Sequence, residues 1–136
     1  MRIFEDYDQL DLQINNVKVT FLNYPYSILH PVKVASVITI PTLLSLASMK
    51  AFALGRRAKW KDYVDLYFIL HDHFTINDIS RECEKTLKDQ FSEKLFRQQL
   101  AFHNDIDFSE PVEFLVEPIP DNTIKEFLIE KAIDIL

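Results

Sequence analysis

Two neighbouring segments of the sequence each place a charged side chain in apolar surroundings. Lys50 is the only charged residue in the range 34–55, and the positions three and four residues away from it are leucine or alanine. Asp65 is the only charged residue in the range 63–70, and Asp62 lies three residues before it on the same helical face. A charged side chain on an apolar face requires an ionic partner or a route to water. The residue types and their spacing therefore predict that these charges meet between two adjacent helices.

The charges on the two segments allow a structural and a catalytic interpretation. The residues alone favour a buried Lys50–Asp65 pair that fixes the register of the two helices. Both carboxylates also lie near the N-terminus of the second helix, where the helix dipole stabilises negative charge. Arg57 lies two helical turns after Lys50, and Lys61 lies one turn before Asp65, so each lies on one of the charged faces.

The remaining side chains of chemical interest have weaker support. Asp105 and Asp107 form an Asp-x-Asp pair without a nearby glycine, and we interpret them as part of a solvated loop. His71 and His73 lie two residues apart, so on a helix they point in different directions and do not form a metal-binding pair. Cys83 lacks the His-Asp arrangement that would activate a nucleophile, which indicates a packed or exposed thiol.

The composition excludes several classes of function. The chain contains one glycine, Gly55, so the glycine-rich loops of dinucleotide-binding folds, P-loops and nucleotidyltransferases are absent from this sequence. Its 21 acidic residues outnumber its 15 basic residues, which argues against broad, charge-driven binding of nucleic acid. The chain has a single cysteine and has acidic residues where a signal peptide would need apolar ones. It also lacks an apolar run of about 18–20 residues. These features predict a cytoplasmic protein without a membrane span.

The pattern of apolar residues predicts one α+β domain over residues 1–136. Apolar residues alternate in Leu10–Ile14 and in Val17–Phe21, and Asn15-Asn16 between them favours a two-residue turn, so these segments predict a hairpin. Val37–Ile40 fits a short third strand because its residues are largely β-branched. A bundle of about five helices follows, with an irregular, proline-containing segment before the last one. The expected helices cover residues 42–56, 59–73, 77–89, 92–103 and 121–136, with Asn77, Ser92 and either Asp121 or Asn122 as N-caps.

The segment Ser45–Leu70 resembles the signature of the AbiEii/AbiGii toxin family of nucleotidyltransferases. Met49-Lys50, Ala53-Leu54 and Arg57 match the helix of that signature. The following motif is matched, with the same spacing, by Lys61-Asp62-Tyr63-Val64-Asp65-Leu66-Tyr67. Upstream, Val17–Leu22 with Tyr24-Pro25 is similar to the preceding strand of the family. The resemblance covers roughly residues 10–70 closely and the rest of the chain by arrangement.

The resemblance implies transfer of a nucleotide from a nucleoside triphosphate, by toxins that are paired with antitoxins and act on RNA acceptors. The intact family uses a Gly-Ser loop for the phosphates and an Asp-x-Asp that holds Mg²⁺. Both should precede Leu10, where Glu5, Asp6 and Asp8 form an acidic cluster but no Gly-Ser accompanies them; Thr20 also stands where the family commonly has a third aspartate. Matching positions imply catalytic roles for Lys50, Asp62 and Asp65 and substrate-binding roles for Arg57 and Lys61.

We therefore expect a truncated or divergent nucleotidyltransferase-like protein of a toxin–antitoxin type system, inactive alone and with no cofactor or metal of its own. Its expected partners are an antitoxin or a complementing N-terminal polypeptide, with RNA bound only after complementation and with no membrane. A homodimer is also expected, because the hairpin leaves an unpaired edge strand. The alternative is a non-enzymatic module on the same scaffold that binds an antitoxin, another chain or itself.

Overall fold

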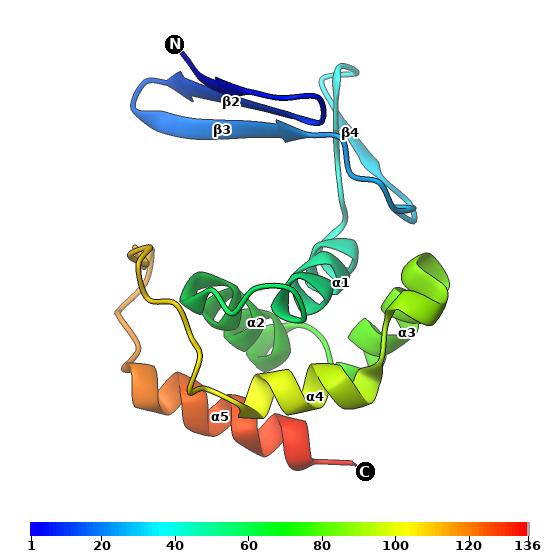
Figure 1. Ribbon diagram of the computed structural model, residues 1–136, viewed down its shortest axis with the longest axis vertical. Coiled ribbons are helices and arrows are strands. Elements are labelled where there is room, and N and C mark those ends of the chain that lie inside the picture. The colour runs from blue at the N-terminus through cyan, green and yellow to red at the C-terminus, as the bar shows by residue number, and fades with distance from the viewer. Residues whose placement is uncertain (136) are drawn as a thin grey trace.

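The structure, a computed structural model that describes residues 1–135, is an α+β fold in which two small sheets stand beside a group of helices (Figure 1). β1 (Arg2–Glu5), β2 (Gln9–Ile14) and β3 (Val17–Leu22) form an antiparallel sheet in the order β1-β2-β3. β4 (Val32–Val34) and β5 (Ile38–Ile40) form a separate antiparallel hairpin. The helices are α1 (Leu43–Leu54), α2 (Trp60–Asp72), α3 (Ile76–Leu87), the 3-10 helix η1 (Lys88–Gln90), α4 (Glu93–Ala101) and α5 (Asp121–Ile133). The predicted fold class is confirmed.

The predicted hairpin forms around Asn15 and Asn16, whose φ angles of 50° and 64° suit a tight turn between twisted strands. The third strand of this sheet is β1. The alternation of apolar residues did not reveal it, because two polar residues flank two adjacent apolar ones in its sequence. The segment Val37–Ile40 does contain a strand, from Ile38 onwards, but it pairs with β4 and does not extend the first sheet. The chain therefore has two separate β elements.

The starts of α1 and α4 agree with the sequence. The side chain of Thr42 accepts a hydrogen bond from the backbone N–H of Ser45, and Ser92 does the same for Leu95. Each bond satisfies one of the N–H groups that a helix leaves without an internal partner. The predicted end of the last helix, at Leu136, lies outside the described residues.

Two predicted N-caps are wrong. Thr75, two residues before the expected Asn77, caps α3, because its side chain and that of Asp78 form reciprocal hydrogen bonds with each other's backbone N–H. Pro120 precedes α5 and supplies no side-chain hydrogen bond, so neither Asp121 nor its neighbour is the N-cap. The helix α3 begins at the capping box and not at Asn77 because the capping box satisfies two backbone donors at once.

The hydrophobic core belongs to the helices. All buried hydrophobic side chains of the described residues lie between Ala47 and Ala132, and none lies in a strand. α1 packs against α2, α3 and α4, while α5 packs against α2 and α4. Figure 1 shows the β1–β3 sheet apart from this group. Among the described helices, none has the length and apolar character needed to cross a bilayer.

Candidate functional site

Lys50 lies on α1 and its ammonium group contacts two carboxylates of α2. The distance from Lys50 Nζ is 2.8 Å to Asp62 Oδ1 and 2.6 Å to Asp65 Oδ2. The predicted contact between Lys50 and Asp65 is thus present. The expectation that this pair is buried is wrong at one end, because the Asp65 side chain is 50% exposed, whereas that of Asp62 is 0% exposed. The buried carboxylate of the site is therefore Asp62.

Asp62 holds two cations from its place in the first turn of α2. Its second oxygen lies 3.3 Å from Nε of Arg57, so the carboxylate bridges Lys50 and Arg57. The helix dipole favours a negative charge at this end of α2. Burial by itself would lower the pKa of Lys50, but the hydrogen bonds to Asp62 and Asp65 outweigh it and raise that pKa. Lys50 therefore carries its charge although only 21% of its side chain is exposed.

The cations of this cluster face a pocket of about 410 Å³ between α1 and the segment that follows β3. The pocket is lined by Lys50, Arg56 and Arg57 and by no carboxylate. Tyr24 and Tyr26 form its aromatic wall, and burial raises the pKa of Tyr24, which keeps that phenol neutral. A pocket with cationic and aromatic walls suits an anionic ligand with a flat group.

Lys61 lies apart from this cluster. Its ammonium group pairs with Glu110, which also accepts from Lys59 at 2.9 Å, while Lys59 contacts Asp107 at 2.9 Å. The backbone N–H of Trp60 donates to the carbonyl of Asp107 at 3.0 Å. These contacts fasten the 104–120 segment to the start of α2, so the structure does not place Lys61 beside the other predicted site residues.

The carboxylates of Glu110 and Asp107, which connect the 104–120 segment to the start of α2, remain ionised. Hydrogen bonds from Lys61 and then Lys59 lower the pKa of Glu110 to about 2. The pKa of Asp107 is also well below its usual range, mainly because of hydrogen bonds from Ser109 and Lys59. Asp107 is an exposed residue of an irregular segment, as predicted, and it is also ion-paired with Lys59. In the sequence, the signal that could have indicated this contact is the pair of lysines, Lys59 and Lys61, on either side of Trp60.

The carboxylates of the cluster do not fit a Mg²⁺ site. Both oxygens of Asp62 are engaged by cations, and Asp65 contacts Lys50. Over residues 1–135, no group of His, Cys, Asp and Glu side chains is arranged to hold a metal ion. The site thus presents positive charge held by carboxylates, which is the arrangement for binding an anion and not a cation.

Sequence reasoning missed a second feature near the expected third carboxylate. Thr20 donates a hydrogen bond to Asp11 across the β2–β3 pair at 2.8 Å, and Lys18 lies 2.9 Å from the same carboxylate. The hydrogen bond from Lys18 contributes most to lowering the pKa of Asp11. A cross-strand carboxylate thus lies opposite the position where the resemblance placed one. The register of the hairpin was the signal that could have indicated it.

Residues 8–134 match the family described as the nucleotidyl transferase AbiEii toxin of type IV toxin–antitoxin systems. This match spans almost the whole chain. The chain belongs to the AbiEii family. No curated protein and no solved structure shows significant similarity to it. The matched range of this AbiEii-family chain contains the Lys50–Asp62–Arg57 cluster and the pocket that the cluster lines, and the family assignment extends the earlier resemblance through α5.

Proposed function

We propose that this chain provides the phosphate-binding helical part of a nucleotidyltransferase-like site in a cytoplasmic toxin–antitoxin system. The observation that carries the proposal is the pocket lined by Lys50, Arg56 and Arg57 without a carboxylate. Asp62 and Asp65 lie behind these cations and hold Lys50 in place. A nucleoside triphosphate brings several negative charges, which charge-assisted hydrogen bonds from such cations would stabilise.

In this proposal the named residues have different tasks. Lys50 and Arg57 bind the phosphates of the nucleotide, since both line the pocket. Arg57 has 53% of its side chain exposed, so it can contact a ligand while Asp62 retains its Nε. Asp62 positions both cations, and Asp65 positions Lys50 from the solvent side. Lys61 acts at a distance by fastening the 104–120 segment to α2.

These 136 residues contain no glycine-rich phosphate loop, and over residues 1–135 no group of His, Cys, Asp and Glu side chains is arranged to hold the metal ion that the chemistry needs. We infer that transfer requires a polypeptide that supplies them, and that this chain by itself does not transfer nucleotides. The test is incubation of the purified chain with RNA and radiolabelled nucleoside triphosphates, with and without Mg²⁺. No label should enter RNA. Adding a polypeptide with the Gly-Ser and Asp-x-Asp motifs should produce labelling.

The variant that tests the pocket is Arg57→Gln. It is chosen because Arg57 is half exposed and its replacement leaves Asp62 paired with Lys50. In the complemented reaction, this variant should label RNA at least about tenfold more slowly, which corresponds to about 1.4 kcal/mol. Labelling by the chain alone, in a preparation free of contaminating nucleotidyltransferase, would refute the need for a partner. An unchanged rate for Arg57→Gln would refute the role of the pocket.

A second candidate, a protein-binding module, is favoured by the apolar face of the β1–β3 sheet. Cross-strand pairs such as Leu12 with Val19 and Ile14 with Val17 place nearly all apolar residues of β2 and β3 on one face. Ile14 and Val17 are 51% and 60% exposed. Such a face, next to the open edge of β3, suits a second copy, an antitoxin or the complementing polypeptide.

Light scattering of the chain across a concentration series separates these partners. Formation of a dimer that Val17→Lys abolishes would support self-association through the hairpin. If the chain is a strict monomer, the sheet face is expected to bind a different protein. The complementing polypeptide described above should then bind the chain, and Val17→Lys should weaken that binding. If Val17→Lys changes neither association, the module hypothesis fails.

A further inference from the structure

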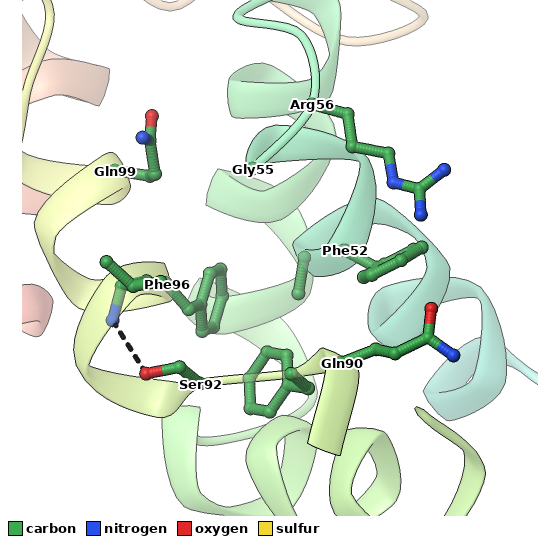
Figure 2. Close-up of a pocket in the computed structure, with 10 residues that line it drawn as sticks. Phe52, Gly55, Arg56, Gln90, Ser92, Phe96 and Gln99 are labelled. Atoms are coloured by element: carbon green, nitrogen blue, oxygen red, sulfur yellow. Dashed lines mark hydrogen bonds between the residues drawn. The ribbon is translucent and has the colours of Figure 1, made fainter. Parts of the chain in front are cut away.

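A second pocket, of about 380 Å³, lies between α1 and the start of α4, on the other side of Phe52 and Arg56 from the cationic pocket (Figure 2). Its volume is in the range of small-molecule sites, which begins at about 300 Å³. Figure 2 shows Phe52 and Phe96 facing each other across the space, with Gln99 on one rim and Arg56 and Gln90 on the opposite rim. Phe91 and Leu95 complete the apolar lining.

The rim formed by Arg56 and Gln90 presents hydrogen-bond donors. Arg56 stacks on Phe52, with its Cζ atom 4.3 Å from the ring centroid, and donates from Nη2 to the hydroxyl of Tyr26 at 2.9 Å. That hydroxyl donates to Oε1 of Gln90 at 3.0 Å, so the amide N–H groups of Gln90 face outward from this relay. In the part of the chain that the structure describes, no carboxylate lies within ion-pair distance of Arg56. An anionic group therefore matches this rim.

The only glycine of the chain, Gly55, forms part of the pocket wall. Its φ of −70° and ψ of −14° are available to any residue, so the backbone does not require glycine. A Cβ atom at this position would meet one atom within 4 Å, the carbonyl oxygen of Phe52 at an ordinary contact distance of 3.6 Å. Neither conformation nor packing within the chain explains the glycine, and the absent side chain widens the pocket.

We propose that this pocket binds a small molecule with a flat ring and a single anionic group, of the size of a mononucleotide. The ring lies on the apolar bed of Phe91, Phe96 and Leu95, and the anion contacts Arg56 and Gln90. The amide of Gln99 can both donate to and accept from a ring edge that carries hydrogen-bonding groups. This site is distinct from the pocket of the proposed nucleotide-transfer function, because Lys50 and Arg57 do not line it, although Phe52 and Arg56 line both pockets.

The single glycine provides a direct reporter for binding. Protein labelled only with 15N-glycine gives one backbone amide signal, from the wall of this pocket. Titration with AMP should shift that signal to saturation, and adenosine, which lacks the phosphate, should bind at least tenfold more weakly. Saturable binding of indole-3-acetate in place of AMP would support the same site with a carboxylate ligand. If neither anion shifts the signal, or if adenosine binds as well as AMP, the proposal is overturned.

Variants assign the binding to one pocket. Leu95→Glu places a negative charge on the rim and should weaken binding of the anionic probe at least tenfold; Leu95 is 59% exposed, so the fold tolerates the change. The matched control, Leu115→Glu, alters a fully exposed leucine of the loop and should have no effect. Loss of binding with Arg57→Gln but not with Leu95→Glu would move the ligand to the cationic pocket and refute the proposal.

Gly55→Ala, followed by calorimetric titration, supplies an independent test. The methyl group would narrow the pocket and reduce affinity severalfold, while the melting temperature of the protein should not fall, because an αR conformation accepts alanine. Unchanged affinity in this variant would mean that the glycine does not shape the site, and would contradict the role assigned to it.

Discussion

Ile79 in α3 and Ile14 in β2 show how differently the two regions of this molecule use the same side chain. Ile79 is 0% exposed and packs in the core of the helices, whereas Ile14 is 51% exposed on the apolar face of the sheet. The helical region thus contains every buried hydrophobic side chain of the described residues, whereas the apolar side chains of the strands are half-buried or exposed. An uncovered sheet face contributes little burial energy, and this contrast is what supports the proposal that the sheet face contacts another protein.

The largest expected effect is at the buried carboxylate. Lys50→Met leaves Asp62, which is 0% exposed, with Arg57 as its only cationic partner, and Asp62→Leu leaves Lys50 with the exposed Asp65. Each single substitution should lower the free energy of unfolding by about 3–5 kcal/mol, and the double variant should recover most of that loss. Denaturant melts of the cycle give the coupling energy. Additive effects would show that the two side chains do not interact.

Asp65→Asn is the matched control for that cycle. Asp65 contacts the same ammonium group but is 50% exposed, so its pair with Lys50 is screened by water. The loss should be below about 1 kcal/mol. An effect as large as that of Asp62→Leu would mean that Asp65 is the buried partner after all.

The next effect compares the two isoleucines directly. Ile79→Ala creates a cavity in the packed helices and should cost about 2–5 kcal/mol of unfolding free energy. Ile14→Ala removes a half-exposed side chain and should cost no more than about 1 kcal/mol, mainly through reduced strand propensity. Equal losses in urea melts of the isolated chain would show that the sheet face is covered, and the contrast between the regions would have to be abandoned.

A smaller effect tests the fastening between α2 and the 104–120 segment. Lys61 and Lys59 lower the pKa of Glu110 to about 2 from an ordinary value of 4.5. Because the folded pKa is depressed, the stabilisation from Glu110 is fully present above pH 4.5 and is lost as the pH falls towards 2. NMR titration of the Glu110 carboxyl group should show this low midpoint, and Lys61→Met should raise it. A midpoint that Lys61→Met leaves unchanged would argue against the contact.

The sequence was sufficient where local pattern and packing agree. Alternation around Asn15-Asn16 predicted the hairpin, and the isolated charges of Lys50 and Asp65 correctly predicted that α1 and α2 lie side by side. It was insufficient for the choice between Asp62 and Asp65, since both lie on one helical face and only the tertiary packing decides which of them is covered. Position in the family motif likewise did not reveal that Lys61 turns towards Glu110.

Other features escaped prediction because they depend on segments far apart in the chain. The donor rim of the second pocket joins Tyr26 after β3, Arg56 after α1 and Gln90 in η1, and no spacing rule connects those positions. The strand β1 was missed because its two apolar residues are adjacent and its sequence does not alternate; its pairing with β2 also contains a register shift between Arg2 and Phe4.

The most direct test of the central claim, that cations held by Asp62 form a phosphate-binding pocket, is calorimetric titration of the chain with ATP. We predict saturable binding for the native chain, binding at least about tenfold weaker for Arg57→Gln, and unchanged binding for Arg81→Gln, which removes an exposed arginine of α3 outside the pocket. Equal affinities for the native chain and Arg57→Gln, or no binding by the native chain, would contradict the account.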